Sequence, residues 1–177
     1  MARVLVAGRI HPDGTAILHE AGLEIDLFTD PGAALPPELL AQADALLIRY
    51  GVLHAADLDG MARLRVVSRH GVGCDNLPVA ELAARGVPVT IVGAVTAVSV
   101  AEQVLAMLLA LSKRIGDYDA AVRAGEWNIR DTLSPRELAG QRLLLLGFGR
   151  IGREVAKRAR AFEMQVAVHD PLVTPEV

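Results

Sequence analysis

The stretch from Leu143 to Gly152 is the feature that most constrains what this chain can fold into. Four leucines, a run typical of a buried strand, lead directly into the spacing G-x-G-x-x-G, and Asp170 follows the last glycine by 18 positions. In such a segment Gly147 permits a tight turn from strand to helix, Gly149 lets the backbone approach a pyrophosphate, and Gly152 lets the helix pack on the strand. The pattern predicts a βαβ unit that binds a dinucleotide.

The residues after the glycines supply the rest of this unit. Arg150 and Ile151 open a predicted helix that runs to Ala161, and the free N–H groups and the dipole at its start favour phosphates. A second strand, Gln165–His169, ends next to Asp170, whose carboxylate suits the 2′-hydroxyl of the NAD ribose. NAD is therefore the expected cofactor. The alternatives are an ordinary strand-to-helix turn and, for Asp170, a solvated turn acid before a proline.

Strands and helices alternate from the first residues onward, which predicts a parallel α/β sheet. Five strands are expected before residue 93, enough for one flavodoxin-like domain. A boundary near Ala94–Ala97 divides the chain into domains 1–95 and 96–177. The second domain has only the strands Arg142–Leu146 and Gln165–His169, whereas a complete Rossmann fold has six, so we expect it to be incomplete and the chain to be truncated at its C-terminal end.

Composition and charge exclude several other classes of protein. The chain has 18 Lys+Arg and 21 Asp+Glu, and the basic residues are scattered, so nucleic-acid binding is not expected. The apolar stretch Val87–Leu111 is interrupted at Gly93, which favours a strand, a loop and a buried helix over a membrane span. The single cysteine, Cys74, forms no internal disulfide, and with no signal peptide expected the predicted location is cytoplasmic. The spacing of histidines and acids indicates no metal site.

Four blocks in order along the chain resemble one family, the D-isomer-specific 2-hydroxyacid dehydrogenases, and in particular their phosphoglycerate dehydrogenase branch. The blocks are Arg65–Asn76, Ser99–Glu102, Leu138–Ala156 with its glycine-rich segment, and Phe162–Pro171. The resemblance covers nearly the whole chain. It implies a substrate domain over 1–95 and an incomplete NAD-binding Rossmann domain over 96–177, with the family's active site in the cleft between such domains.

The same resemblance implies which residues bind the acid. Val72 and Gly73 would present backbone N–H groups to the substrate carboxylate, and the flanking Gly71 suggests an anion-binding nest, the alternative being a plain turn. Arg49 and Arg69 each end a predicted strand and would hold the carboxylate or a phosphate, unless they are surface or structural arginines.

The resemblance implies an NAD-dependent oxidoreductase that acts on the CH–OH group of a 2-hydroxy acid. Its small-molecule partner would be a 2-hydroxy or 2-keto acid, and the full-length protein would be a homodimer. The family's catalytic Arg, Glu and His lie beyond Val177, so no catalytic residue is assigned and the chain alone is expected to be inactive. Thr96 stands where relatives often have an Asn that contacts the substrate, so the resemblance does not identify the acid. The alternatives are a non-enzymatic acid-binding or dimerising module and an unrelated reductase fragment.

Overall fold

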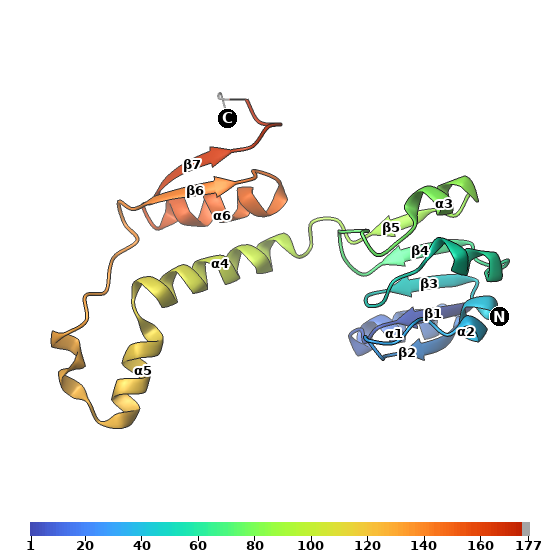
Figure 1. The fold of residues 1–177 in the computed structure, drawn as a ribbon, viewed down its shortest axis with the longest axis horizontal. Coiled ribbons are helices and arrows are strands. Elements are labelled where there is room, and N and C mark those ends of the chain that lie inside the picture. The colour runs from blue at the N-terminus through green and yellow to red at the C-terminus, as the bar shows by residue number, and fades with distance from the viewer. Residues whose placement is uncertain (175–177) are drawn as a thin grey trace. The chain divides into compact units, whose positions relative to one another are not determined.

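The structure is a computed structural model that describes residues 1–174 and contains two compact units, Met1–Gly93 and Ala94–Val177 (Figure 1). The last three residues of the second unit, and of the predicted domain 96–177, lie outside the described residues. The functions assigned to domains 1–95 and 96–177 remain predictions.

The first unit is a parallel sheet whose strands run in the order β2-β1-β3-β4-β5 (Figure 1). This is the flavodoxin-like order, and the predicted α/β fold class is confirmed. The elements of this unit are β1 (Arg3–Ala7), α1 (Pro12–Glu20), β2 (Glu24–Phe28), α2 (Pro37–Gln42), β3 (Ala45–Ile48), the 3-10 helix η1 (Ala55–Gly60), β4 (Val66–Arg69), α3 (Val79–Ala84) and β5 (Val89–Ile91).

The core of the first unit lies where the central strands meet α2, η1 and α3. Leu46, Ile48 and Val67 are fully buried there, as expected for strands that are covered and rich in branched aliphatic residues. Because the strands are parallel, the carboxyl ends of β1, β3 and β4 meet at one edge of the sheet. Arg49 and Arg69 are brought to this edge.

The second unit is a two-stranded parallel sheet with helices packed on one face, as far as residues 1–174 describe it. Leu143 and Leu145 point to the helical face, where they pack against Ala101, Leu105 and Val155. The elements of this unit are α4 (Ala97–Ser112), α5 (Ile115–Ala124), the 3-10 helix η2 (Trp127–Asp131), β6 (Arg142–Leu146), α6 (Arg150–Ala161) and β7 (Gln165–His169).

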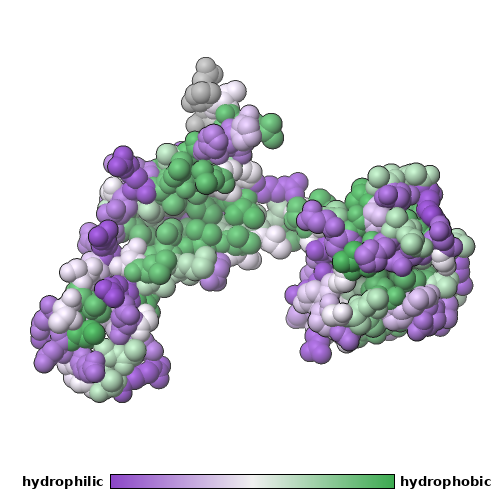
Figure 2. Space-filling model, in the orientation of Figure 1, coloured by the Kyte–Doolittle hydropathy of each residue, from purple (hydrophilic) through white to green (hydrophobic). Residues whose placement is uncertain are grey.

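The other face of this small sheet is open. Leu144 and Leu146 are 60% and 78% exposed, and Figure 2 shows apolar side chains gathered over β6, β7 and α4. Each strand has a single neighbour within the described residues, so each leaves one edge unpaired. A two-stranded sheet of this kind is of marginal stability by itself.

The helix expected within the apolar stretch Val87–Leu111 is present as α4, but it is only partly buried, and its buried residues are Ala97, Ala101 and Leu105. Arg114 after it adopts a left-handed conformation with φ of 54°. A second helix and a 3-10 turn, α5 and η2, follow and were not expected from the sequence. No helix among residues 1–174 combines the length and apolar composition that a transmembrane span requires.

Candidate functional site

The glycine-rich segment forms a tight turn between β6 and α6. Gly147 has φ of +97°, a conformation that residues with a side chain rarely adopt, and its N–H extends the ladder by donating to the His169 carbonyl at 2.8 Å. Gly152 packs against this turn so closely that a Cβ there would overlap the carbonyl oxygen of Gly147. Both glycines therefore have the structural role that the sequence pattern assigns to them.

The first turn of α6 is open to an anion. Gly149 is the residue before the helix, has no side chain to cap it, and accepts the N–H of Arg153 at 3.1 Å. The first N–H groups of a helix have no partner within it, and the helix dipole favours negative charge at this end. Arg150 and Ile151 begin the helix and are exposed, so their N–H groups suit a phosphate.

Asp170 connects the end of β7 to the glycine-rich turn. One carboxylate oxygen accepts the Phe148 N–H at 2.6 Å and the other accepts the Leu172 N–H at 2.8 Å. These hydrogen bonds, the Phe148 bond first, lower the pKa of Asp170 below its ordinary value, so the group is anionic at neutral pH. Each oxygen keeps a further lone pair, which leaves acceptors for ribose hydroxyls.

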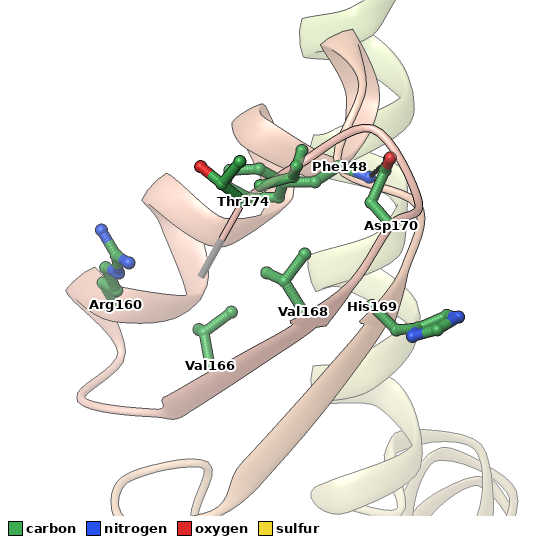
Figure 3. Close-up of a pocket in the computed structure, with 8 residues that line it drawn as sticks. Phe148, Arg160, Val166, Val168, His169, Asp170 and Thr174 are labelled. Atoms are coloured by element: carbon green, nitrogen blue, oxygen red, sulfur yellow. Dashed lines mark hydrogen bonds between the residues drawn. The ribbon is translucent and has the colours of Figure 1, made fainter. Parts of the chain in front are cut away.

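A shallow cavity of about 380 Å³ lies beside this carboxylate (Figure 3). Val166 and Val168 line it on the side of β7 that faces α6, whereas the side chain of His169 points to the opposite side of the strand. Near the mouth of the turn, the guanidinium of Arg153 lies over the Phe148 ring at 4.6 Å. The sequence reasoning missed this Arg153–Phe148 contact and the Asp170–Phe148 bond, because neither partner is determined by spacing along the chain.

Arg9, Arg49 and Arg69 stand at or just after three neighbouring strand ends at the carboxyl edge of the first unit. Arg69 Nη1 lies 3.3 Å from the carbonyl oxygen of Arg49, and Arg49 Nη1 donates to the carbonyl oxygen of Arg9 at 2.5 Å. Within residues 1–174 none of the three guanidinium groups has a carboxylate at salt-bridge distance. Arg9 was missed, although its position just after β1 is the signal that would have found it.

The loop after β4 carries the predicted carboxylate site. Val72 and Gly73 are exposed, and their N–H groups donate no hydrogen bond to any residue that the structure describes. Neither Gly71 nor Gly73 has a positive φ, so the alternating right- and left-handed form of a nest is not made, and anion binding by this loop stays a prediction. A Cβ at Gly71 would instead make tight contacts, from 3.0 Å, with the Arg69 guanidinium, which would have to shift by a few tenths of an ångström.

His70 and Cys74 are two further polar residues of the segment that follows β4. His70 is exposed, and its N–H continues the strand pairing by donating to the Ile48 carbonyl at 2.9 Å. Among the described residues no group of three or more His, Cys, Asp and Glu side chains is arranged to hold a metal ion. Cys74 is a half-buried free thiol.

The second unit has the βαβ geometry typical of nucleotide-binding domains, and comparison with known proteins shows which family it resembles. Residues 105–177 match the NAD binding domain of the D-isomer specific 2-hydroxyacid dehydrogenases. The D-3-phosphoglycerate dehydrogenase of Methanocaldococcus jannaschii is 34% identical over 178 aligned residues, which cover 100% of this chain. These matches confirm the predicted resemblance to the D-isomer specific 2-hydroxyacid dehydrogenases and the predicted NAD cofactor.

Solved structures show the same fold. The NADPH-dependent glyoxylate/hydroxypyruvate reductase of Sinorhizobium meliloti, in complex with citrate, matches with a TM-score of 0.84 and 30% identity over 100% of this chain and 56% of that one. The D-lactate dehydrogenase of Aquifex aeolicus, complexed with NAD and lactic acid, matches with a TM-score of 0.84 and 26% identity over 98% of this chain and 53% of that one. The chain spans 34% of the length of the M. jannaschii relative.

Proposed function

We propose that this chain supplies the acid-binding and NAD-binding parts of a dehydrogenase that acts on the CH–OH group of a 2-hydroxy acid. The observation that carries the proposal is the second unit's combination of a turn closed by Gly147 and Gly152 with the Asp170 carboxylate attached to that turn. An ordinary strand-to-helix turn has no need for such close packing or for an acid at the end of the next strand.

The residues present fit NAD. The pyrophosphate would lie on the N–H groups of Gly149, Arg150 and Ile151, and the ribose hydroxyls would donate to Asp170. When bound, NAD supplies the hydride acceptor, while the protein supplies orientation and electrostatics. The Phe148 N–H keeps the Asp170 carboxylate in place for the ribose before the nucleotide arrives.

The acid would bind at the carboxyl edge of the first unit. The free N–H groups of Val72 and Gly73 suit a carboxylate, and Arg49 and Arg69 lie on the strand ends beside them. Three arginines without carboxylate partners favour an acid that carries a second negative group. This supports a phosphorylated hydroxy acid of the kind named for the M. jannaschii relative over lactate or glyoxylate.

Titration calorimetry with NAD tests the cofactor half of the proposal. Asp170→Asn keeps an oxygen that accepts the Phe148 N–H but removes the charge that a ribose hydroxyl would meet. Charge-assisted hydrogen bonds contribute about 1.5–3 kcal/mol, so we expect at least about tenfold weaker binding. Asp119→Asn is the matched control, since that carboxylate accepts only from Arg123 on exposed α5. Equal affinity in both variants would exclude Asp170 from the site.

We also propose that the protein is a homodimer, and the segment formed by α5 and η2 supports this. Its apolar side chains Ile115, Val122 and Trp127 are 53%, 50% and 70% exposed, and Ala121 is the single buried residue of α5. Large exposed apolar side chains gathered on one segment are typical of an interaction surface. Light scattering should give twice the chain mass for the protein and the monomer mass for Trp127→Ser with Val122→Ser; a monomeric starting protein would end this part of the proposal.

A polypeptide of these 177 residues alone should turn over 2-hydroxy acids very slowly. Positioned acid–base groups contribute about 10²–10⁴-fold to such reactions, and the family resemblance assigns them to positions after Val177. The alternative function is a dimerising module without activity, and the exposed apolar side chains of the α5–η2 segment favour it. NADH oxidation with phosphohydroxypyruvate, hydroxypyruvate and glyoxylate compares this chain with a version extended through a complete NAD-binding domain. Equal rates in the two would contradict the proposal.

A further inference from the structure

The side chain of Arg69 folds back over the loop that follows β4. Its Nε donates to the Gly73 carbonyl at 2.9 Å, and its Nη1 donates to the His70 carbonyl at 2.9 Å. Nη1 also lies 3.3 Å from the carbonyl oxygens of Ile48 and Arg49 at the end of β3. One guanidinium therefore connects both sides of the loop to the neighbouring strand.

Gly71 leaves the space that this arrangement needs. A Cβ at Gly71 would lie 3.0 Å from both Cζ and Nη1 of Arg69 and 3.2 Å from Nη2, tighter than side chains normally pack. Because the φ of Gly71 is not positive, backbone conformation does not explain a glycine here. The guanidinium of Arg69 leaves little room for a side chain at this position.

Few other contacts hold this loop. The Sγ of Cys74 lies 3.9 Å from the Val72 carbonyl, a weak contact, and the Val92 N–H donates to the Gly71 carbonyl at 3.2 Å. The far end is fixed by Asn76, whose Nδ2 donates to the Gly51 carbonyl at 2.8 Å. At Gly73 itself, the bond from Arg69 Nε is the direct connection to the sheet within the described residues.

We propose that Arg69 is a positioning residue that fixes the loop from Gly71 to Gly73, and with it the direction of the Val72 and Gly73 N–H groups, before any acid binds. Its Nε and Nη1 are used for this purpose, and Nη2 is left over for a ligand. The consequence for acid binding rests on the proposed function, whereas the order of the loop does not.

Nuclear magnetic resonance relaxation of the full chain without ligand tests the positioning directly. The 15N order parameters of Val72 and Gly73 should be near 0.85 in the starting protein and below about 0.6 in Arg69→Ala. Arg69→Lys should resemble Arg69→Ala, because an ammonium group has no Nε donor for the Gly73 carbonyl. Unchanged order parameters in Arg69→Ala, or full rescue by lysine, would overturn the proposal.

The neighbouring glycine gives a second, independent readout. Gly71→Ala should displace the guanidinium and lower the same order parameters, and the double variant with Arg69→Ala should be no worse than Arg69→Ala alone. Gly60→Ala is the control, because a Cβ there meets nothing within 4 Å. Additive losses in the double variant would mean that the two residues act separately, contrary to the proposal.

Titration with two acids separates positioning from direct contact. If Arg69 fixes the loop, Arg69→Ala weakens the binding of both D-lactate and 3-phosphoglycerate, because both carboxylates use the Val72 and Gly73 N–H groups; a contact of Nη2 with the phosphate would add to the loss for 3-phosphoglycerate. A loss confined to 3-phosphoglycerate would show direct contact with the phosphate and would overturn the positioning role. If neither acid binds the starting protein, the proposed function fails at this site, while the relaxation measurements still decide the role of Arg69.

Discussion

The close packing of Gly152 on Gly147 makes Gly152→Ala the most informative single substitution in the second unit. The added Cβ would overlap a backbone carbonyl oxygen, which no side-chain rotation relieves. Overpacking of this kind costs about 1–3 kcal/mol. Replacing a helical glycine by alanine returns at most about 0.5–1 kcal/mol through backbone entropy. The difference is about 0–2.5 kcal/mol, and because the overlapped atom belongs to the backbone we expect the upper half of this range, a net loss of stability of about 1–2 kcal/mol.

Gly116→Ala is the matched control, because Gly116 lies in the first turn of α5 and a Cβ there meets nothing within 4 Å. This variant gains the backbone entropy without the overlap, so it should be neutral or slightly stabilising. The pair of variants separates the effect of space from the effect of helix propensity.

Hydrogen exchange measured by mass spectrometry on peptides covering β6 is the suitable assay. A loss of one to two kcal/mol raises the population of the opened state, and hence the exchange rate, by roughly 5–30-fold. NAD affinity should fall as well, because the carbonyl that must move belongs to the turn that we propose binds the pyrophosphate. Exchange in β6 equal to that of Gly116→Ala would refute the argument from packing.

Three further predictions concern both units. NAD should bind at least about tenfold more tightly than NADP, because the 2′-phosphate of NADP would lie next to the negative charge of Asp170. The S. meliloti relative is NADPH-dependent, so both cofactors should be measured by calorimetry, and tighter binding of NADP would contradict the prediction. The Asp170–Phe148 hydrogen bond contributes its full stability above the ordinary carboxyl pKa of 3.8, and this contribution is lost as the pH falls through the lowered pKa of Asp170. The chemical shift of the Phe148 amide should therefore change with pH below 3.8. In Asp170→Asn, which has no carboxyl group to protonate, this change should disappear. Amides of Val66–Val67 should exchange more slowly than those of Leu143–Leu146, because the second sheet has unpaired edges; the reverse order would contradict it.

The parts of the fold that the sequence predicts well are those encoded by local patterns. Branched aliphatic runs separated by turn residues predict the strands of the first unit. The glycine spacing predicts the turn at Gly147, because the positive φ at Gly147 and the close packing at Gly152 are both requirements of the local structure. Helix α5 was not predicted, since its sequence is polar, contains Gly116 and begins after a left-handed Arg114 that no periodicity indicates. Its exposed apolar residues are too few to give a helical stripe.

Side-chain partners at the candidate site were harder to predict, because they depend on tertiary structure. The sequence pattern predicts that Arg49 and Arg69 lie at strand ends, and it leaves open whether they bind a ligand or have a structural role. Which carbonyl oxygens a guanidinium reaches depends on the register of β3 and β4, which pair Ile48 with Arg69. The register of β1 and β3, which pairs Ala7 with Ile48, brings Arg9 next to Arg49, and no spacing along the chain relates those two residues.

The two glycine-rich loops look alike in sequence but need their glycines for different physical reasons. At Gly147 the positive φ is the requirement, and a Cβ would meet nothing within 4 Å, so any residue with a side chain is strained whatever surrounds it. At Gly71 the φ is not positive and the obstacle is the side chain of Arg69. Strain at Gly147 therefore has no second-site remedy among its neighbours, whereas a side chain at Gly71 becomes acceptable once Arg69 is shortened. A glycine pattern alone predicts only that a loop approaches a ligand closely. Whether a glycine is required by the backbone conformation, as at Gly147, or by a neighbouring side chain, as at Gly71, is shown by the structure around it.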